Sequence, residues 1–294
     1  MLRTDSCVAA MLNRGYEMCG MDSISDKVRL EEFERDGYVV LREFWQHGEL
    51  DELQSQLDEL GKLVVGEKFT SRDRSNYELT SLDQSLLYDR LKYLPALSLM
   101  SGSSAVRQMC RGLGLEHPSL MGCCNMRLDK PHDTKHLFAW HQDTVYLLGS
   151  VNAVTVWIPL QDVNLQCGTI QVIPGSHRRG LAPFKRISEK AIAPYVPFLQ
   201  RDISLAESVT DEPVTIEARR GDLVVFKQML LHRSTPNLGE QIRWSAQLRI
   251  TDLADPEYRR QRFPTGDRTN IFYVDYPGHD SVARRAQEFG DISA

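Results

Sequence analysis

The spacing of apolar residues changes along this chain, and the change constrains the fold more than any other feature. Before about residue 115, apolar residues recur every three or four positions, as Leu50, Leu53, Leu57 and Leu60 do, and this period is typical of amphipathic helices. From about residue 119 the period becomes two, which indicates strands. The clearest alternating or β-branched runs are residues 154–160, 169–173, 223–226 and 242–250. A helical half followed by short strands predicts an antiparallel sandwich or barrel supported by helices.

We therefore expect a mainly β protein with flanking helices, arranged as a double-stranded β-helix, or cupin-like jelly roll. The 294 residues suit one such unit. The expected parts are a loose extension over residues 1–24 and one domain over 25–294. Within that domain we expect a helical support at about 25–115, a jelly roll at about 119–252 and a tail at 253–294. Residues 180–212 interrupt the strands as a long, proline-containing insertion, which is typical of a lid or a substrate loop.

Composition and charge narrow the class of protein. Hydrophobic residues make up 41% of the chain and charged residues 26%, as in an ordinary globular enzyme. The net charge of −5 argues against nucleic acid as a partner, and no apolar run is long enough to predict a membrane span. Residues 1–20 lack the apolar centre of a signal peptide, so we expect a cytoplasmic protein with its six cysteines reduced. The sequence leaves the oligomeric state open.

One pair of motifs indicates a metal centre. His141-Gln142-Asp143 lies in a strand expected over residues 140–144, and on a strand His141 and Asp143 would share one face. A third candidate ligand, His232, follows much later, and a jelly roll brings such distant strands side by side. Two imidazoles and a carboxylate suit Fe(II), Mn(II) or Zn(II), and they form the facial triad of non-haem iron oxygenases.

Arg243 lies eleven residues after His232 in a run that alternates well. Trp244 and Ala246 form its apolar side, which places Arg243, Ser245 and Gln247 on the other face. An arginine inside a barrel needs a carboxylate partner, and a dicarboxylic acid that binds its planar guanidinium in bidentate fashion meets that need.

Together these motifs resemble the phytanoyl-CoA dioxygenase family over about residues 26–252. The segments that carry the resemblance are Phe33–Val40, His141-Gln142-Asp143, Trp157, Gly168-Thr169 with Pro174-Gly175-Ser176-His177, and His232-Arg233-Ser234 with Arg243. The resemblance implies a double-stranded β-helix with Fe(II), 2-oxoglutarate and O₂. It also implies a dioxygenase that hydroxylates an unactivated C–H bond and releases succinate and CO₂.

Carried over by position, the resemblance identifies His141, Asp143 and His232 as the iron ligands and Arg243 as the 2-oxoglutarate anchor. Ser234 and Trp157 match positions that line the co-substrate pocket. We add Ser245, from the strand alternation. The further candidates are Asn125 for the co-substrate, and Arg127, Tyr146 and Gln142 for the substrate.

The substrate class is not carried over from the family. The basic pairs Arg178-Arg179 and Lys185-Arg186 are better explained as a solvated loop than as a site for CoA phosphates. A small metabolite or natural-product intermediate is therefore expected. Because Asp143 is present, a halogenase, which lacks the carboxylate ligand, is disfavoured. Two alternatives remain: a metal-binding or small-molecule-binding jelly roll without oxygenase chemistry, and a cupin-like isomerase or hydrolase that uses Zn or Mn. For an oxygenase, the sequence also leaves open whether the reaction is hydroxylation, desaturation, epoxidation or ring closure.

Overall fold

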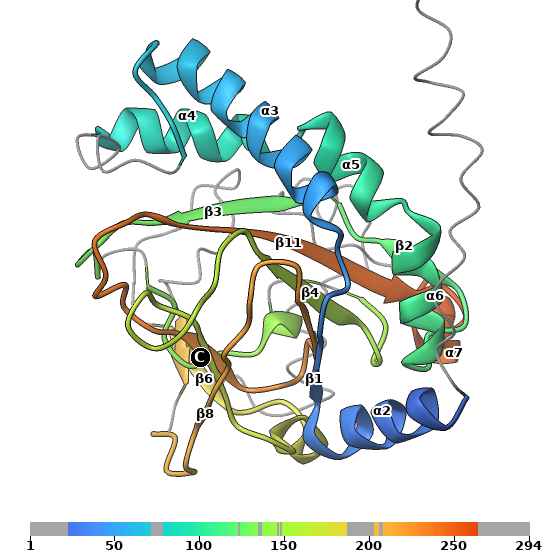
Figure 1. The fold of residues 1–294 in the computed structure, drawn as a ribbon. Coiled ribbons are helices and arrows are strands. Elements are labelled where there is room, and N and C mark those ends of the chain that lie inside the picture. Colours follow the sequence, from blue (N-terminus) through green and yellow to red (C-terminus); the bar gives the residue numbers. More distant parts are fainter. Residues whose placement is uncertain are drawn as a thin grey trace, which may run out of the picture.

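The chain forms a mainly β, cupin-like jelly roll with flanking helices (Figure 1). This computed structural model describes residues 23–71, 79–122, 124–134, 137–145, 147, 149–186, 203–205 and 208–263. Most of the expected extension and tail, and the middle of the 180–212 insertion, lie outside these residues. Within the described part, every strand pairing is antiparallel.

The larger sheet has six strands in the order β1-β9-β4-β11-β2, and β3 also pairs with β11. Their bounds are β1 Tyr38–Leu41, β2 Pro118–Leu120, β3 Asn125–Asp129, β4 Val154–Pro159, β9 Leu223–Lys227 and β11 Arg243–Asp252. The bounds of β4, β9 and β11 agree with the strand-like runs expected over residues 154–160, 223–226 and 242–250. The long β11 pairs with three strands, so it fixes the register on which the site depends.

The smaller sheet has the order β10-β5-β8, with β5 Ile170–Val172, β8 Val214–Thr215 and β10 His232–Ser234. A separate pair joins β6 Phe184–Arg186 to β7 Ile203–Leu205 inside the expected insertion. The two larger sheets face one another, and a buried cluster fills the space between them. Trp157, Val224 and Phe226 contribute to that cluster from the six-stranded sheet, and Ile170 and Val172 from the three-stranded one.

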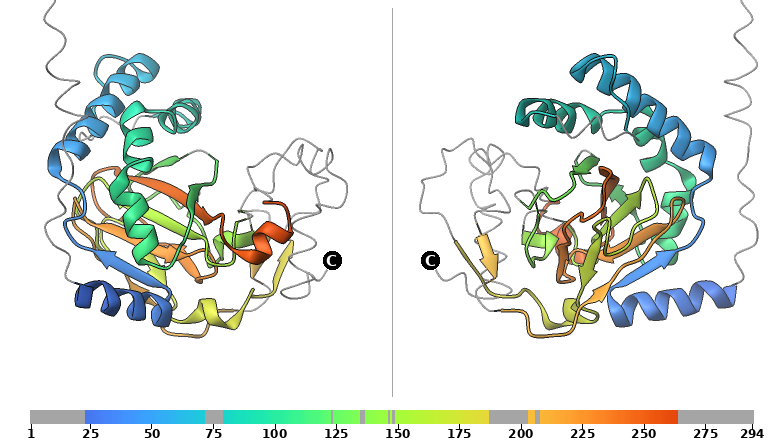
Figure 2. Two further views of the ribbon diagram at one scale, coloured as in Figure 1. Left: turned by 90° about the vertical axis from the view of Figure 1, so that its right-hand side faces the viewer. Right: turned by 60° about the vertical axis from the view of Figure 1, so that its left-hand side comes forward.

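Helices cover the other face of the larger sheet (Figures 1 and 2). The α-helices are α2 Ser23–Asp36, α3 His47–Val65, α4 Ser81–Leu91, α5 Pro95–Ser101, α6 Ser104–Gly112 and α7 Pro256–Arg260. Short 3-10 turns lie at Asp143–Val145 (η2) and Ser176–Arg179 (η3). The main core joins Leu50, Leu53 and Leu57 of α3 to Trp244 and Leu248 of β11. Burying this apolar surface provides the main drive for docking the helices on the sheet.

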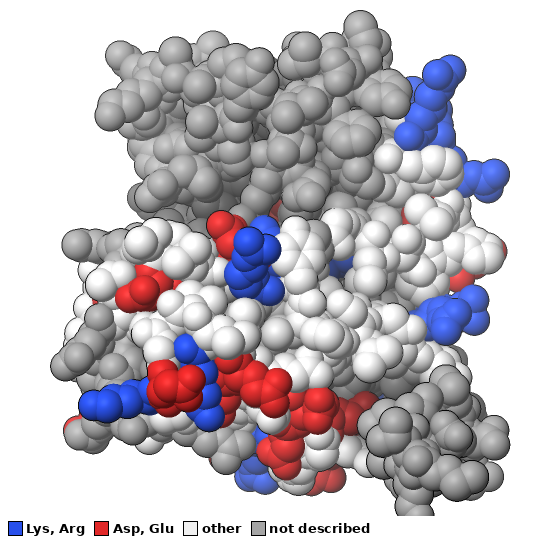
Figure 3. Space-filling model, turned by 90° about the horizontal axis from the view of Figure 1, so that it is seen from above, with Lys and Arg blue, Asp and Glu red and all other residues white. Residues whose placement is uncertain are grey.

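The outer surface of the helical layer carries both signs of charge. Seen from above, acidic side chains form a band, and lysines and arginines lie scattered around it (Figure 3). Among the exposed acids of α3 are Asp51, Glu52 and Glu59. In the part of the chain that the structure describes, no helix is long and apolar enough to cross a membrane.

Two helix boundaries differ from those that the apolar pattern predicts, which are a helix stop at Gly61 and one helix from about Leu97 to Gly112. Helix α3 does not stop at Gly61 but continues to Val65. Gly61 is needed for packing, because a Cβ there would lie 2.0 Å from Cε1 of the buried Phe69 ring. The single helix expected over 97–112 is broken at Gly102, and Ser103 caps the second part by accepting a hydrogen bond from the Val106 N–H.

Candidate metal centre

The fold brings His141 next to His232, although the two are far apart in the sequence. The backbone N–H of each donates to the carbonyl of the other at 3.0 Å, which makes an isolated antiparallel bridge. The strand expected over 140–144 is therefore only one bridge long. The chain turns at once into η2, and Asp143 is its first residue. This turn places the Asp143 carboxylate beside both imidazoles.

The three predicted ligands converge on one point. Nε2 of His141 lies 3.6 Å from Oδ1 of Asp143, and Nε2 of His232 lies 3.8 Å from the same oxygen. One ligand atom from each residue lies within 4.8 Å of the others. Asp143 and His232 are buried, and the His141 side chain is 11% exposed. This spacing suits three donors around a single metal ion.

Both imidazoles are oriented by backbone carbonyls. Nδ1 of His141 lies 2.7 Å from the Ala139 carbonyl oxygen, and Nδ1 of His232 lies 2.9 Å from that of Leu230. A carbonyl only accepts, so each Nδ1 carries the proton and each Nε2 presents a lone pair. Burial, together with the neighbouring His141 ring, lowers the pKa of His232 to about 3. His232 is therefore neutral near pH 7 and ready to bind a metal.

Asp143 is held through its other oxygen. Oδ2 accepts a hydrogen bond of 2.6 Å from the Thr155 hydroxyl and lies 3.3 Å from Nε of Arg249. Burial by itself would raise the pKa of Asp143, but the Arg249 charge and the two imidazoles hold it well below its usual range. The site thus offers one carboxylate oxygen and two imidazole nitrogens that point to one place. Such a set of converging lone pairs fits a divalent cation.

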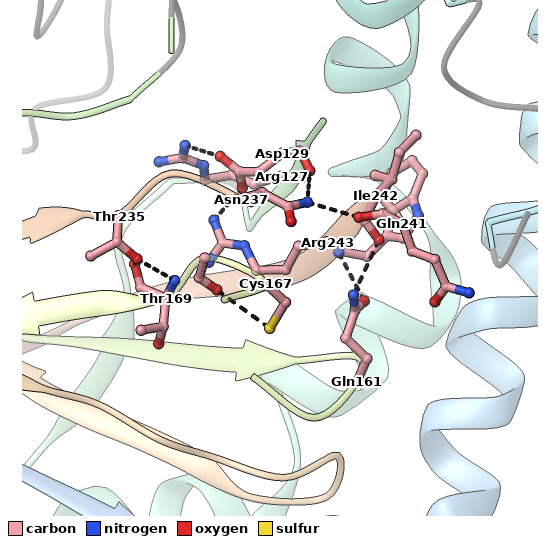
Figure 4. Close-up of polar contacts among 12 residues, drawn as sticks. Arg127, Asp129, Gln161, Cys167, Thr169, Thr235, Asn237, Gln241, Ile242 and Arg243 are labelled. Carbon is pink, nitrogen blue, oxygen red and sulfur yellow. Dashed lines mark hydrogen bonds and ion pairs between the residues drawn. The ribbon is translucent and has the colours of Figure 1, made fainter. Parts of the chain in front are cut away.

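A second polar cluster surrounds Arg243, which is 2% exposed. Its Nη2 donates to Oδ2 of Asp129, and Oδ1 of Asp129 accepts from Arg127 at 2.7 Å (Figure 4). Burial would raise the pKa of Asp129, but the two guanidinium groups hold it below its usual value. The cluster therefore has two positive charges against one negative charge. Nε of Arg243 is buried and has no hydrogen-bond partner among the described residues.

The other expected co-substrate residues lie on the same inner face. Trp157 is buried, and its ring centre lies 5.6 Å from the Arg243 guanidinium carbon. In the strand register, Asn125 and Trp157 both lie opposite Gln247. The Ser245 hydroxyl is buried and has no partner in the described part of the chain. Orphaned buried donors require a partner, so the cluster fits an anionic, oxygen-rich ligand.

Ser234 follows His232 by two positions on β10, so alternation places both on the same face.

The three expected substrate contacts have different surroundings. The Arg127 guanidinium stacks on the Phe138 ring at 4.3 Å and joins the Arg243 cluster. Tyr146 lies outside the described residues.

Gln142 points away from the metal centre, as strand alternation indicates. Its amide donates to the carbonyls of Gly180 and Met229, at 3.0 and 2.6 Å, and accepts from the Ala182 N–H at 2.7 Å. These bonds tie the metal-binding segment to the start of the insertion. We therefore propose a structural role for Gln142 in place of the substrate contact expected from the sequence.

Sequence reasoning missed three residues of the site: Asp129, Thr155 and Arg249. A signal existed for Arg249, because the alternation that places Arg243, Ser245 and Gln247 inside the barrel extends to it. No comparable signal identified Asp129 or Thr155. Their roles depend on which strands pair and in which register.

Comparisons with known proteins agree with this geometry. The sequence model of the phytanoyl-CoA dioxygenase (PhyH) family matches residues 33–245. Phytanoyl-CoA dioxygenase domain-containing protein 1 of Mus musculus is 23% identical over 268 residues, which cover 77% of this chain and 90% of the relative. Phytanoyl-CoA dioxygenase 1 of Oryza sativa subsp. japonica is 24% identical over 276 residues, which cover 82% of this chain and 94% of the relative.

Among solved structures, the epimerase SnoN in complex with Fe³⁺, alpha ketoglutarate and nogalamycin RO has the same fold. The TM-score is 0.59 at 17% sequence identity, and the match covers 88% of this chain and 93% of SnoN. Because the family match spans most of the chain and includes all three converging ligands, this protein belongs to the phytanoyl-CoA dioxygenase family.

Proposed function

We propose that this protein is a Fe(II)- and 2-oxoglutarate-dependent dioxygenase that hydroxylates an unactivated C–H bond of a small metabolite or natural-product intermediate, with release of succinate and CO₂. The observation that carries the proposal is the pairing of two features inside one barrel. Three lone pairs converge at His141, Asp143 and His232, and a buried, under-satisfied arginine lies on the strand face beside them. Family membership supports the same chemistry.

Each residue then has a definite task. Nε2 of His141, Oδ1 of Asp143 and Nε2 of His232 would hold Fe(II). Arg243 would bind the distal carboxylate of 2-oxoglutarate, with Ser234 and Ser245 as hydrogen-bond donors. When bound, the iron and the keto acid supply the oxidising power of O₂.

The protein's own contribution is orientation and a water-poor site. Trp157 and Phe226 are 1% exposed, and the Phe226 ring lies 4.6 Å from the His232 ring. These apolar walls favour reaction within the bound substrate over loss of oxidant to water. The Arg127–Asp129 pair holds the Arg243 guanidinium in place before any ligand arrives, which lowers the entropy cost of binding.

The substrate proposed is a small molecule and not an acyl-CoA. Arg179, one of the basic residues near the insertion, donates both Nη groups to Asp211 at 2.8 Å. That bidentate ion pair already occupies the guanidinium, so Arg179 is not free for a phosphate. This supports the interpretation of the Arg178-Arg179 pair as a solvated loop.

The first test is anaerobic addition of Fe(II) and 2-oxoglutarate to the metal-free protein. Chelation of the keto acid by iron produces a weak visible charge-transfer band, which we expect in the wild type. We expect His232→Ala to abolish the band and Arg243→Ala to shift its half-saturation to higher 2-oxoglutarate concentration. Succinate release would then report turnover in a substrate screen. A protein that binds metal but shows neither the band nor 2-oxoglutarate consumption would instead be a metal-binding jelly roll without oxygenase chemistry.

A further inference from the structure

The metal ligand Asp143 has two carboxylate oxygens in different environments. Oδ1 faces the two Nε2 atoms at 3.6 and 3.8 Å. Oδ2 faces the six-stranded sheet, where the Thr155 hydroxyl donates to it at 2.6 Å and Nε of Arg249 lies at 3.3 Å. The sheet therefore holds the carboxylate through Oδ2 and leaves Oδ1 facing the two imidazoles.

The two gripping residues are themselves fixed by the sheet. Thr155 on β4 and Arg249 on β11 are direct partners in the antiparallel register, so both side chains leave the sheet at the same level. Thr155 is fully buried, and Arg249 is 9% exposed. Nη2 of Arg249 donates to the Gln247 side-chain oxygen at 2.9 Å, and this bond helps to fix the guanidinium.

The hydrogen-bonding groups of Arg249 are poorly satisfied, which argues against a role in stability alone. Nε and Nη1 are buried and make no hydrogen bond of good geometry to any described residue. Leaving donors of a buried charged group without partners costs free energy, so an arginine at this position destabilises the fold. A functional role explains this cost if the guanidinium holds the Asp143 carboxylate.

The way in which Asp143 ligates decides how many metal positions remain open. A carboxylate can bind a cation through one oxygen or through both. An octahedral ion held by the facial triad keeps room for a bidentate keto acid and for O₂ only if the carboxylate uses one oxygen. With both oxygens bound, one of those positions is lost.

We propose that Thr155 and Arg249 are positioning residues that hold Oδ2 of Asp143 away from the metal, so that Asp143 ligates through Oδ1 alone. The inference rests on the metal site of the proposed function. If Arg249 served only as a counter-ion for Asp143, any cationic side chain at position 249 would serve equally well. Positioning, by contrast, requires the Thr155 hydroxyl, which donates to Oδ2, and a guanidinium held beside that oxygen.

The test compares Thr155→Val, which removes the hydroxyl, with Thr155→Ser, which keeps it. Metal-free proteins are loaded anaerobically with Co(II), and the Co(II) affinity is measured by calorimetry. 2-Oxoglutarate binding to the loaded protein is then measured from the change in the Co(II) absorption spectrum. We expect Thr155→Val to weaken 2-oxoglutarate binding about 10- to 100-fold, the scale on which residues behind a metal ligand affect metal affinity or activity. The change in Co(II) affinity should be smaller, because a second bound oxygen takes a position that the keto acid needs. Thr155→Ser should bind both close to the wild type.

Thr169→Val is the matched control. Its hydroxyl is also fully buried and donates at 2.6 Å, but to the Ile216 carbonyl and not to a metal ligand. It should lower the thermal midpoint without changing 2-oxoglutarate affinity. Arg249→Lys is the second variant, and it decides the matter if Thr155→Val does not fold. It keeps the charge but loses the planar guanidinium that the Gln247 bond holds beside Oδ2. Positioning therefore predicts weaker 2-oxoglutarate binding, whereas a pure counter-ion role predicts no change in 2-oxoglutarate affinity.

The outcomes separate the two proposals. Equal 2-oxoglutarate affinity for Thr155→Val and Thr155→Ser, or for Arg249→Lys and the wild type, would overturn the positioning role and leave the proposed function standing. A wild type that binds Co(II) but not 2-oxoglutarate would refute the proposed function. The positioning role could then still be judged from the Co(II) spectra of the variants, which report the coordination of the ion.

Discussion

Replacing Asp129 by Asn tests the electrostatic account of the Arg243 cluster. Asp129 is 7% exposed and separates two guanidinium groups, those of Arg127 and Arg243. Asn keeps the shape and one acceptor oxygen but removes the negative charge. The buried Arg243 guanidinium would then lose its carboxylate partner, and breaking a buried ion pair in this way costs about 3–5 kcal/mol.

Because Asn retains one acceptor oxygen, we expect a loss of folding stability near the lower end of this range, roughly 3 kcal/mol. For a domain of this size, that corresponds to a fall in thermal midpoint of about 6–12 °C. The assay is thermal unfolding of the metal-free protein near neutral pH, followed by circular dichroism. Asp211→Asn is the control, because Asp211 also pairs with an arginine but does so at the surface, where its loss should leave the midpoint unchanged.

Two measurements on Asp129→Asn test this electrostatic account: its thermal midpoint, and the effect of 2-oxoglutarate on that midpoint. A midpoint for Asp129→Asn equal to that of the wild type would show that Arg127 and Arg243 need no counter-ion in the interior. The argument for an anionic ligand at Arg243 would then lose its physical basis. If the reasoning holds, added 2-oxoglutarate should recover part of the lost stability, because it returns a carboxylate to the same guanidinium groups.

Three further predictions concern packing, pH and metal. Gly61→Ala should lower the thermal midpoint, because its Cβ would meet Phe69, whereas Gly48→Ala in the same helix has open space and should be neutral or stabilising by up to about 1 kcal/mol. Burial raises the pKa of Asp252, but four N–H donors hold it below its usual value. A carboxylate with a depressed folded-state pKa stabilises above its unfolded pKa of about 3.9, and that stability is lost as pH falls through the folded value. Asp252→Asn should therefore flatten the acid limb of a stability–pH curve, and an unchanged limb would contradict the assignment. Finally, Co(II) at 100 times its dissociation constant should stabilise the wild type by about 2.7 kcal/mol, and this gain should disappear in His232→Ala.

Local periodicity was sufficient for much of the fold, and short motifs were sufficient to single out the candidate metal ligands. Alternation along β11 predicted that Arg243 and Ser245 lie on the face opposite Trp244. In the structure Trp244 belongs to the core cluster shared with α3, whereas the Arg243 guanidinium lies against the Trp157 ring. The motif around His141 and Asp143 identified candidate ligands, and the fold brings them together with His232. These features depend on neighbours along the chain, so the sequence contains them directly.

The tertiary structure decided the contacts around those ligands. Asp129 meets Arg243, and Thr155 meets Arg249, because β11 pairs with β3 and β4 in one particular register. A shift of that register by one residue would turn each of these side chains to the other face of the sheet. The turn at Asp143 likewise depends on the backbone bridge between His141 and His232. Contacts across strands far apart in the chain are set by the packing of the whole barrel, and local sequence patterns carry no record of them.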